Sequence, residues 1–111
     1  MAGKYNLPDI VRTDTFEAEQ FQIVIDGTAL DLTGATIEAV FAKDKKRGQR
    51  VKSISVGSGI TVTDAANGTF EFDTFDLNWS AGVYYYDIQI TKDSVITTYV
   101  VGTINVIDNV W

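Results

Sequence analysis

The chain has 111 residues, no cysteine and no histidine. Its length fits one domain. The composition excludes disulfides, thiol chemistry, nucleophile pairs that depend on histidine and the usual zinc ligand sets. A net charge of −6 argues against nucleic-acid partners, because these need clustered Lys and Arg. Without a long apolar run or a signal segment, we expect a soluble protein with no membrane partner.

Residues 1–13 are predicted to form an extended N-terminal arm that precedes a single β-sandwich domain over residues 14–111. The first nine residues show no periodicity, and the single proline, Pro8, favours an extended conformation at Leu7. Such an arm is either a loose end, the commoner case, or a strap over a neighbouring subunit. Tyr5 and Leu7 are therefore candidate interface residues.

The first strand is predicted within residues 14–26. Every second side chain from Phe21 to Ile25 is apolar, and Asp26-Gly27 is a typical turn sequence. This pattern predicts a strand that buries one face and ends at a tight turn.

Residues 35–42 follow the break at Thr33-Gly34 and alternate between apolar and more polar or smaller side chains. Their Ala and Glu content would also suit a helix, but the strict alternation favours a strand. The next segment, residues 43–50, is the one basic cluster of the sequence. We interpret it as a solvated hairpin loop rather than as a site for phosphate or an acidic partner.

Three further short strands are predicted at residues 51–55, 60–63 and 68–72. Asn67-Gly68 is a hairpin signal, because both residue types tolerate a positive φ. Phe75 and Leu77 lie in the polar connection over residues 73–80 and are predicted to plug one end of the core.

The strongest pattern is a long antiparallel hairpin over residues 82–106, with its loop at Lys92-Asp93-Ser94. Side chains of a strand alternate between its two faces, so the even-numbered positions share one face. Asp87 then lies on the opposite face, where we expect it to be at least partly exposed. The side chains predicted to face the core are Tyr84, Tyr86, Ile88, Ile90, Ile96, Val100, Ile104 and Val106.

Eight or nine short strands, spaced by about ten residues, predict an all-β sandwich or barrel. Two sheets packed about 10 Å apart would form the core. Its predicted members are Phe21, Ile23, Ile37, Phe41, Phe70, Phe72, Tyr84 and Tyr86.

Nothing in the spacing of the acidic residues pairs two carboxylates, as acid–base catalysis of glycoside cleavage would require. Asp73 with Asp76, and Asp64 with Asn67, offer only two oxygen ligands each, too few for a calcium loop. We therefore expect no enzyme activity, no metal and no cofactor, and interpret these residues as turn formers.

Four aromatic residues fall off the core face or at its margins: Trp79, Tyr85, Tyr99 and Trp111. An exposed row of aromatics could stack on sugar rings, as in a carbohydrate-binding module. It could equally form a subunit interface, where Tyr and Trp are enriched. The third reading is that these rings cap the ends of the sandwich.

The order of short phrases along the chain resembles a known family. These phrases are Leu30–Ile37, the charged segment 43–50, Gly59–Asp64, Gly68–Phe70, Ala81–Gln89 and Thr97–Val106. Together they are similar to the immunoglobulin-like β-sandwich domain of tailed-phage and prophage baseplate and tail proteins. They are also similar to the N-terminal domain of the baseplate upper protein family.

The resemblance covers about residues 14–108 and implies an immunoglobulin-like sandwich of two antiparallel sheets. It implies a non-catalytic virion component, made in the bacterial cytoplasm, that docks other tail or baseplate subunits, and it leaves open whether this component is a hub, an adaptor or a decoration. Because phage assemblies are symmetric, the chain could form a homo-oligomer or occupy a position in a ring. Each matched phrase also has a local explanation, and for Gly102 this is a β-bulge or the close approach of another segment.

Overall fold

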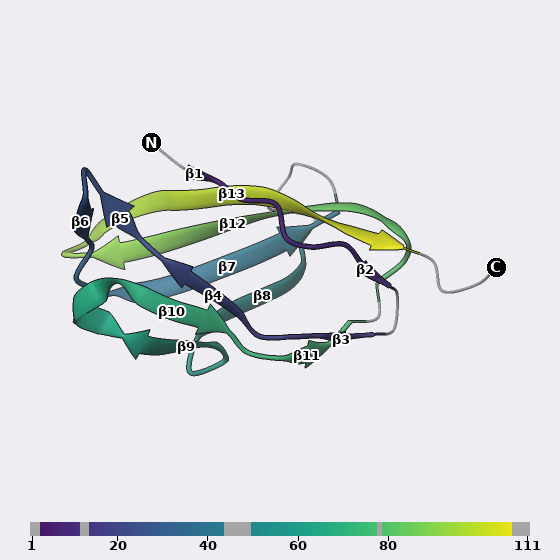
Figure 1. Cartoon of the computed structure of the whole chain (residues 1–111), viewed down its shortest axis with the longest axis horizontal. Coiled ribbons are helices and arrows are strands. Elements are labelled where there is room, and N and C mark those ends of the chain that lie inside the picture. The colour runs from purple at the N-terminus through teal and green to yellow at the C-terminus, as the bar shows by residue number, and fades with distance from the viewer. Residues whose placement is uncertain (1–2, 12–13, 44–49, 78, 108–111) are drawn as a thin grey trace.

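The structure is a computed structural model that describes residues 3–11, 14–43, 50–77 and 79–107. In these residues the regular elements are strands and one short 3₁₀ turn (Figure 1), which confirms the prediction of an all-β chain. The strands are β1 (Gly3–Lys4), β2 (Ile10–Val11), β3 (Thr15–Phe16), β4 (Glu19–Gln22), β5 (Val24–Ile25), β6 (Thr28–Ala29), β7 (Thr36–Ala42), β8 (Arg50–Val56), β9 (Gly59–Asp64), β10 (Thr69–Phe72), β11 (Phe75–Asp76), β12 (Gly82–Lys92) and β13 (Val95–Ile107).

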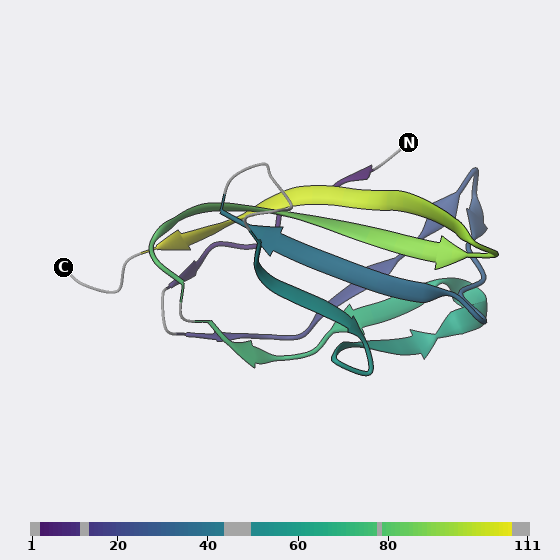
Figure 2. The same cartoon turned by 180° about the vertical axis from the view of Figure 1, so that it is seen from behind.

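Nine of these strands belong to one mixed sheet in the order β1-β13-β12-β7-β8-β9-β10-β4, with β2 also paired to β13. β11 pairs with β3, and β5 pairs with β6, in two small separate ribbons. The large sheet curls, so that β4, β9 and β10 lie opposite β7, β12 and β13 (Figures 1 and 2). The backbone pairing is thus that of one curled sheet rather than of two separate antiparallel sheets.

A short parallel contact between β8 and β9 joins the two halves of the curled sheet. It contains only two residue pairs, Ser55 with Gly59 and Val56 with Ile60. The chain loops back into the same direction between the two strands, and Gly57 and Gly59 allow this with φ values of +84° and +105°, a conformation that residues with a side chain rarely adopt. The sequence predicts a glycine-rich turn at this point, but it does not predict that the strands on either side of the turn pair in parallel.

The hairpin of β12 and β13 is the longest element, and it forms with the predicted loop. Its turn residues Asp93 and Ser94 have φ values of +52° and +66°, as expected for a tight hairpin turn whose twist matches that of the strands. The inward row of β12 is buried as predicted: Tyr84, Tyr86, Ile88 and Ile90.

A β-bulge changes the second half of this hairpin. Ile88 pairs with Val100, but Gln89 pairs with Thr98, so Tyr99 is an additional residue in β13. One inserted residue reverses the facing of every side chain beyond it. The prediction that Ile96 faces the core is therefore wrong: this side chain is 65% exposed. The other three predicted positions of β13 (Val100, Ile104 and Val106) are buried.

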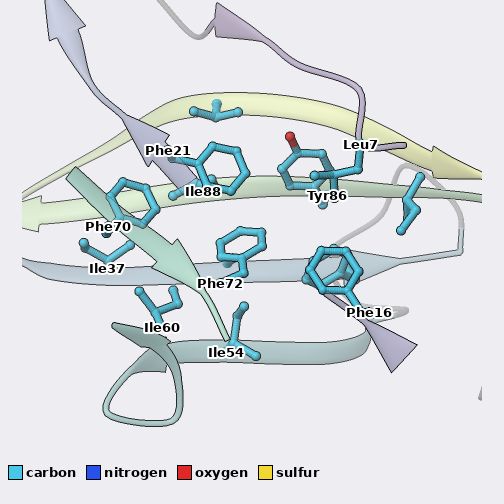
Figure 3. Close-up of a cluster of buried hydrophobic side chains, with 14 of the residues drawn as sticks. Leu7, Phe16, Phe21, Ile37, Ile54, Ile60, Phe70, Phe72, Tyr86 and Ile88 are labelled. Carbon is cyan, nitrogen blue, oxygen red and sulfur yellow. The ribbon is translucent and has the colours of Figure 1, made fainter. Parts of the chain in front are cut away.

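The core lies between the two halves of the curled sheet (Figure 3). All eight predicted core residues are buried. Leu77 is fully buried, and Phe75 stacks on Phe16 with ring centroids 4.7 Å apart, so these residues close one end of the core as predicted. Leu7 and Leu32 are also buried, although their local sequence shows no strand periodicity.

Both predicted turns join antiparallel strands, but their conformations differ. Asp26 and Gly27 adopt φ values of +51° and +79° and form the tight turn between β5 and β6. The β9–β10 connection instead contains the 3₁₀ turn Ala65–Asn67, and only its following residue, Gly68, has a positive φ. The hairpin predicted at Asn67-Gly68 is confirmed, because β9 and β10 pair antiparallel on either side of this connection. Most of the basic segment, residues 44–49, lies outside the described residues.

Candidate functional site

The N-terminal segment over residues 3–11, which we call the strap, lies along β13 (Figure 1). β1 and β2 both pair with β13 in parallel. Between them, the amide of Tyr5 donates to the carbonyl of Val101 at 2.9 Å, and the amide of Leu7 donates to the carbonyl of Thr103 at 2.8 Å. The strap is therefore bound to its own domain and is not a loose end.

The strap also connects β13 to β4, which is the opposite end of the curled sheet. The Leu7 side chain is 4% exposed and belongs to the core (Figure 3), so it is not an interface residue in this conformation. Tyr5 is 44% exposed, and its hydroxyl donates to the carboxylate of Glu19 at 2.5 Å. Its ring meets Phe21 edge-on with centroids 5.8 Å apart. The strap thereby closes the gap between the two ends of the sheet.

At Gly102 the backbone of the strap approaches β13 closely. A Cβ atom built there would collide with the carbonyl group of Tyr5 and would lie 2.8 Å from the ring of Tyr86. The Tyr86 hydroxyl donates to this same carbonyl at 2.5 Å, and the amide of Thr103 donates to Asn6 Oδ1 at 3.2 Å. Of the two explanations for Gly102, the close approach of another segment is thus confirmed, because no larger residue fits under the strap.

The pKa of Tyr86 is raised above its usual value. Burial of the phenol is the main cause, and the nearby Tyr5 and Glu19 add to it by disfavouring a second negative charge. The pKa of Tyr5 is also raised, first because its hydroxyl donates to Glu19. Neutral Tyr86 is thus the form that holds the strap.

We expect the folded chain to lose stability as the pH rises above about 10, where tyrosine ionises in an unfolded chain. Below that pH the neutral form of Tyr86 is present in both states, so its contribution is fully retained. Between the unfolded and the higher folded pKa, only the unfolded state releases this proton, and unfolding becomes easier. Urea denaturation from pH about 9 to about 11 measures the slope. The Tyr86→Phe variant should show a shallower slope, and equal slopes would contradict this assignment.

A second surface is the outer face, formed by the side chains of β13, β12, β7 and β8 that point away from the core. Its centre is Tyr85, which is half-buried and pairs across the strands with Ala42 and Thr103. Val83 and Val101 are 47% and 38% exposed on this face. The outer face is therefore partly apolar.

Polar and buried residues complete the outer face. Asp87, half-buried as predicted, pairs with Val101 on one side and with Val40 on the other. Val40 is almost fully buried, although it lies on this face. The surface around Tyr85 thus combines apolar area with a carboxylate.

Trp79 and Tyr99 pack against the core. The ring of Trp79 lies 5.4 Å from that of Phe41 and 4.9 Å from that of Tyr84, between centroids, so Trp79 caps the end of the core. Tyr99 is half-buried, packs against the core and is the additional residue of the bulge. Trp111 lies outside the described residues. Of the four aromatic residues that the sequence grouped as one candidate surface, Trp79 and Tyr99 thus contribute to the core instead.

The acidic residues considered as metal ligands take part in local hydrogen bonds. Asp64 accepts from the amide group of Asn67 at 2.8 Å, and Asp73 accepts from the Thr61 hydroxyl at 2.7 Å. The pKa of Asp31 is lowered, mainly by hydrogen bonds from Thr33. Within the described ranges, no group of three or more acidic residues is arranged to hold a metal ion.

A shallow groove of about 360 Å³ separates the second half of the strap from the segment that follows it. Residues 8–11 form one wall, and residues 14–19 form the other. Four carboxylates occur among the lining residues: Asp9, Asp14, Glu17 and Glu19. The groove is thus acidic on both sides, and the hydrogen bond from the amide of Asp14 to the carbonyl of Val11 at 3.0 Å joins its two walls.

These observations define a small all-β domain with a docked N-terminal strap and a partly apolar outer sheet face. No protein-family model matches the chain, and no curated protein matches it either. Among the described residues, no helix is long and apolar enough to cross a membrane.

Sequence reasoning did not identify the docking site of the strap. Gly102 was the one available signal, because a glycine within an otherwise continuous strand pattern indicates a bulge or a close backbone approach. Nothing local indicated which segment approaches, since Tyr5 and Gly102 are almost the full chain apart.

Proposed function

We propose that this chain is a non-catalytic structural module of a phage virion that docks neighbouring tail or baseplate subunits. The phrase order described above supports the phage assignment. In this proposal the protein assembles in the bacterial cytoplasm and is then part of the tail or baseplate, where it also contacts further copies of itself.

We further propose that the curled sheet is a variant of the immunoglobulin-like sandwich. Packing across the core supports this: Phe72 of β10 lies 5.9 Å from Phe41 of β7 and 6.4 Å from Tyr86 of β12, between ring centroids. β4, β9 and β10 would form one layer, and β7, β8, β12 and β13 the other. The short parallel β8–β9 contact would then be a link between layers rather than part of a sheet.

The observation that carries the docking proposal is the outer face around Tyr85. A half-buried tyrosine flanked by exposed Val83 and Val101 gives apolar area and a hydroxyl on a rigid sheet. Interfaces are enriched in tyrosine, and contiguous exposed apolar area on a small domain marks interaction sites. The continuous backbone pairing of β13, β12 and β7 keeps this surface rigid before binding, which limits the entropy lost on association.

Co-expression with the tail and baseplate subunits encoded beside this chain tests the proposal. We expect a stable complex that survives gel filtration and is lost in the Val83→Lys variant, because a charge would be placed at the apolar surface. Thr63→Lys, at an exposed position of β9 on the other layer, is the matched control and should retain the complex. Failure of every neighbouring subunit to bind, or equal binding by both variants, would contradict the proposal.

The alternative function, a carbohydrate-binding module, requires a row of exposed aromatic rings. Trp79 contacts core rings and Tyr99 packs against the core, so among the described residues these two do not extend the surface of Tyr85. No observation here favours sugar binding, and it stays an untested prediction.

A further inference from the structure

We propose that the docking site of the strap also accepts the strap of a second copy, so that two or more chains exchange their N-terminal segments. The site comprises the edge of β13 around Gly102, the Tyr86 hydroxyl and the Glu19–Phe21 surface of β4. Its ligand is an extended segment that runs parallel to β13. This inference concerns association of the chain with itself and does not depend on the phage assignment.

The site is specific for an extended segment with a tyrosine and a leucine two residues apart. Tyr5 supplies the carbonyl that Tyr86 binds and the hydroxyl that Glu19 binds. Leu7 supplies the buried side chain, and Asn6 accepts a hydrogen bond from the amide of Thr103. The site therefore recognises both the backbone and the side chains of residues 5–7.

The bonds of the strap with the rest of the domain join residues that are distant in sequence. The Tyr5–Glu19, Tyr86–Tyr5 and Thr103–Asn6 hydrogen bonds span 14, 81 and 97 positions, respectively. None of these bonds requires that both partners belong to the same molecule. Because copies are identical, an exchanged strap forms the same hydrogen bonds and buries the same leucine, so exchange requires no new interface.

The junction between the strap and the rest of the chain is also suited to exchange. The strap ends at Val11, and the groove separates residues 8–11 from residues 14–19. One backbone hydrogen bond, from the amide of Asp14 to the carbonyl of Val11 at 3.0 Å, joins the two segments, and an exchanging strap would have to break or re-form it. The open groove lined by carboxylates adds little packing that would hold the strap to its own domain. A strap on a short linker still has a high effective concentration at its own site, so exchange is favoured in concentrated samples or assemblies.

Cysteine cross-linking between full-length copies tests this proposal, because the chain contains no cysteine of its own. Val11 of the strap pairs directly with Ile107 of β13, and both side chains are at least partly exposed. Paired residues of adjacent strands lie within the range of a disulfide. One variant carries Val11→Cys and the other carries Ile107→Cys. The two are unfolded together in urea, refolded at high concentration and oxidised.

We expect a covalent dimer that joins the two substituted positions, in roughly tenfold excess over a control pair of Val11→Cys with Thr63→Cys. Adding Gly102→Ala to both chains should reduce the dimer to the control level, because the strap can no longer dock. A single chain with both Val11→Cys and Ile107→Cys should form the bond internally, which shows that the geometry permits it.

Two results would overturn the proposal. If the doubly substituted chain closes internally but the mixture gives no dimer above the control pair, the strap binds only its own domain. If the doubly substituted chain does not form the bond, the strap does not dock at β13 in the register described. Sedimentation of the wild-type chain after the same refolding gives a second measurement, and purely monomeric protein would also count against exchange.

Discussion

Replacing Phe41 by alanine is expected to lower the free energy of unfolding by about 4 kcal/mol. Phe41 is fully buried in β7, and its ring centroid lies 5.4 Å from Trp79, 5.6 Å from Tyr86 and 5.9 Å from Phe72. These rings come from both halves of the curled sheet and from the connection before β12. The substitution would leave a cavity that no single strand can close by moving. Urea denaturation measures the loss.

The matched control is Ile96→Ala, a large-to-small change of an apolar residue at an exposed position. Its effect should stay within about 0.5 kcal/mol, since 65% of this side chain is already in water. Comparable losses for the two variants would contradict both the shared core and the bulge that turns Ile96 outward. A Phe41→Ala loss below about 1 kcal/mol would show that the two halves do not pack on one another.

Replacing Gly102 by alanine is expected to displace the strap and to lower the free energy of unfolding by about 3 kcal/mol. The added Cβ collides with the backbone of Tyr5, which is not the end of a flexible side chain and cannot simply rotate away. Displacement exposes Leu7 and breaks the hydrogen bond from Tyr86 to Tyr5. Urea denaturation gives the energy, and hydrogen exchange at the Tyr5 and Leu7 amides reports the position of the strap.

The expected loss of stability in Gly102→Ala is opposite in sign to the usual effect of replacing glycine by alanine within a strand. Within a strand, alanine usually stabilises a protein relative to glycine, by about 0.5–1 kcal/mol. The unfolded chain with alanine has fewer conformations, so it loses less conformational entropy on folding. Val101→Ala, at the neighbouring exposed position, is the control and should change stability little. Retained protection of the Leu7 amide in Gly102→Ala would show that the strap does not cross at this glycine.

The strap contributes to the fold in a way that differs from that of the other strands. It is short, yet it covers the edge of β13 and contacts β4, the strand at the opposite end of the curled sheet. Unpaired strand edges are sites of unwanted association, and natural proteins usually cover them. A removable cover is also a means of joining copies, which relates the stability of this domain to its proposed assembly.

Local sequence was sufficient to predict much of the fold. Alternation over residues 82–90 correctly predicted which side chains of β12 are buried, and the Lys92-Asp93-Ser94 loop was also correct. Both signals depend on neighbouring residues, because strand side chains alternate and tight turns need particular residue types. Sequence reasoning failed at Ile96, since no local feature marks the insertion of Tyr99 into the ladder.

The candidate sites were less predictable for the same reason. Tyr85 was correctly placed off the core face by alternation, but Trp79 contacts the core through a connection with no period. Leu7 was assigned to an interface because its surroundings show no pattern, whereas its burial depends on β13, almost a full chain length away.

The sequence by itself determined that this is an all-β chain with a long hairpin and an aromatic core. The alternation of apolar side chains and the choice of turn residues depend only on residues that are close together in the sequence. The tertiary structure alone decided that the sheet curls through β8 and β9, that Ile96 faces outward and that the strap crosses Gly102. The docking of the strap depends on contacts between residues 14 to 97 positions apart. Such contacts are set by packing and close backbone approach, which no short window of sequence contains.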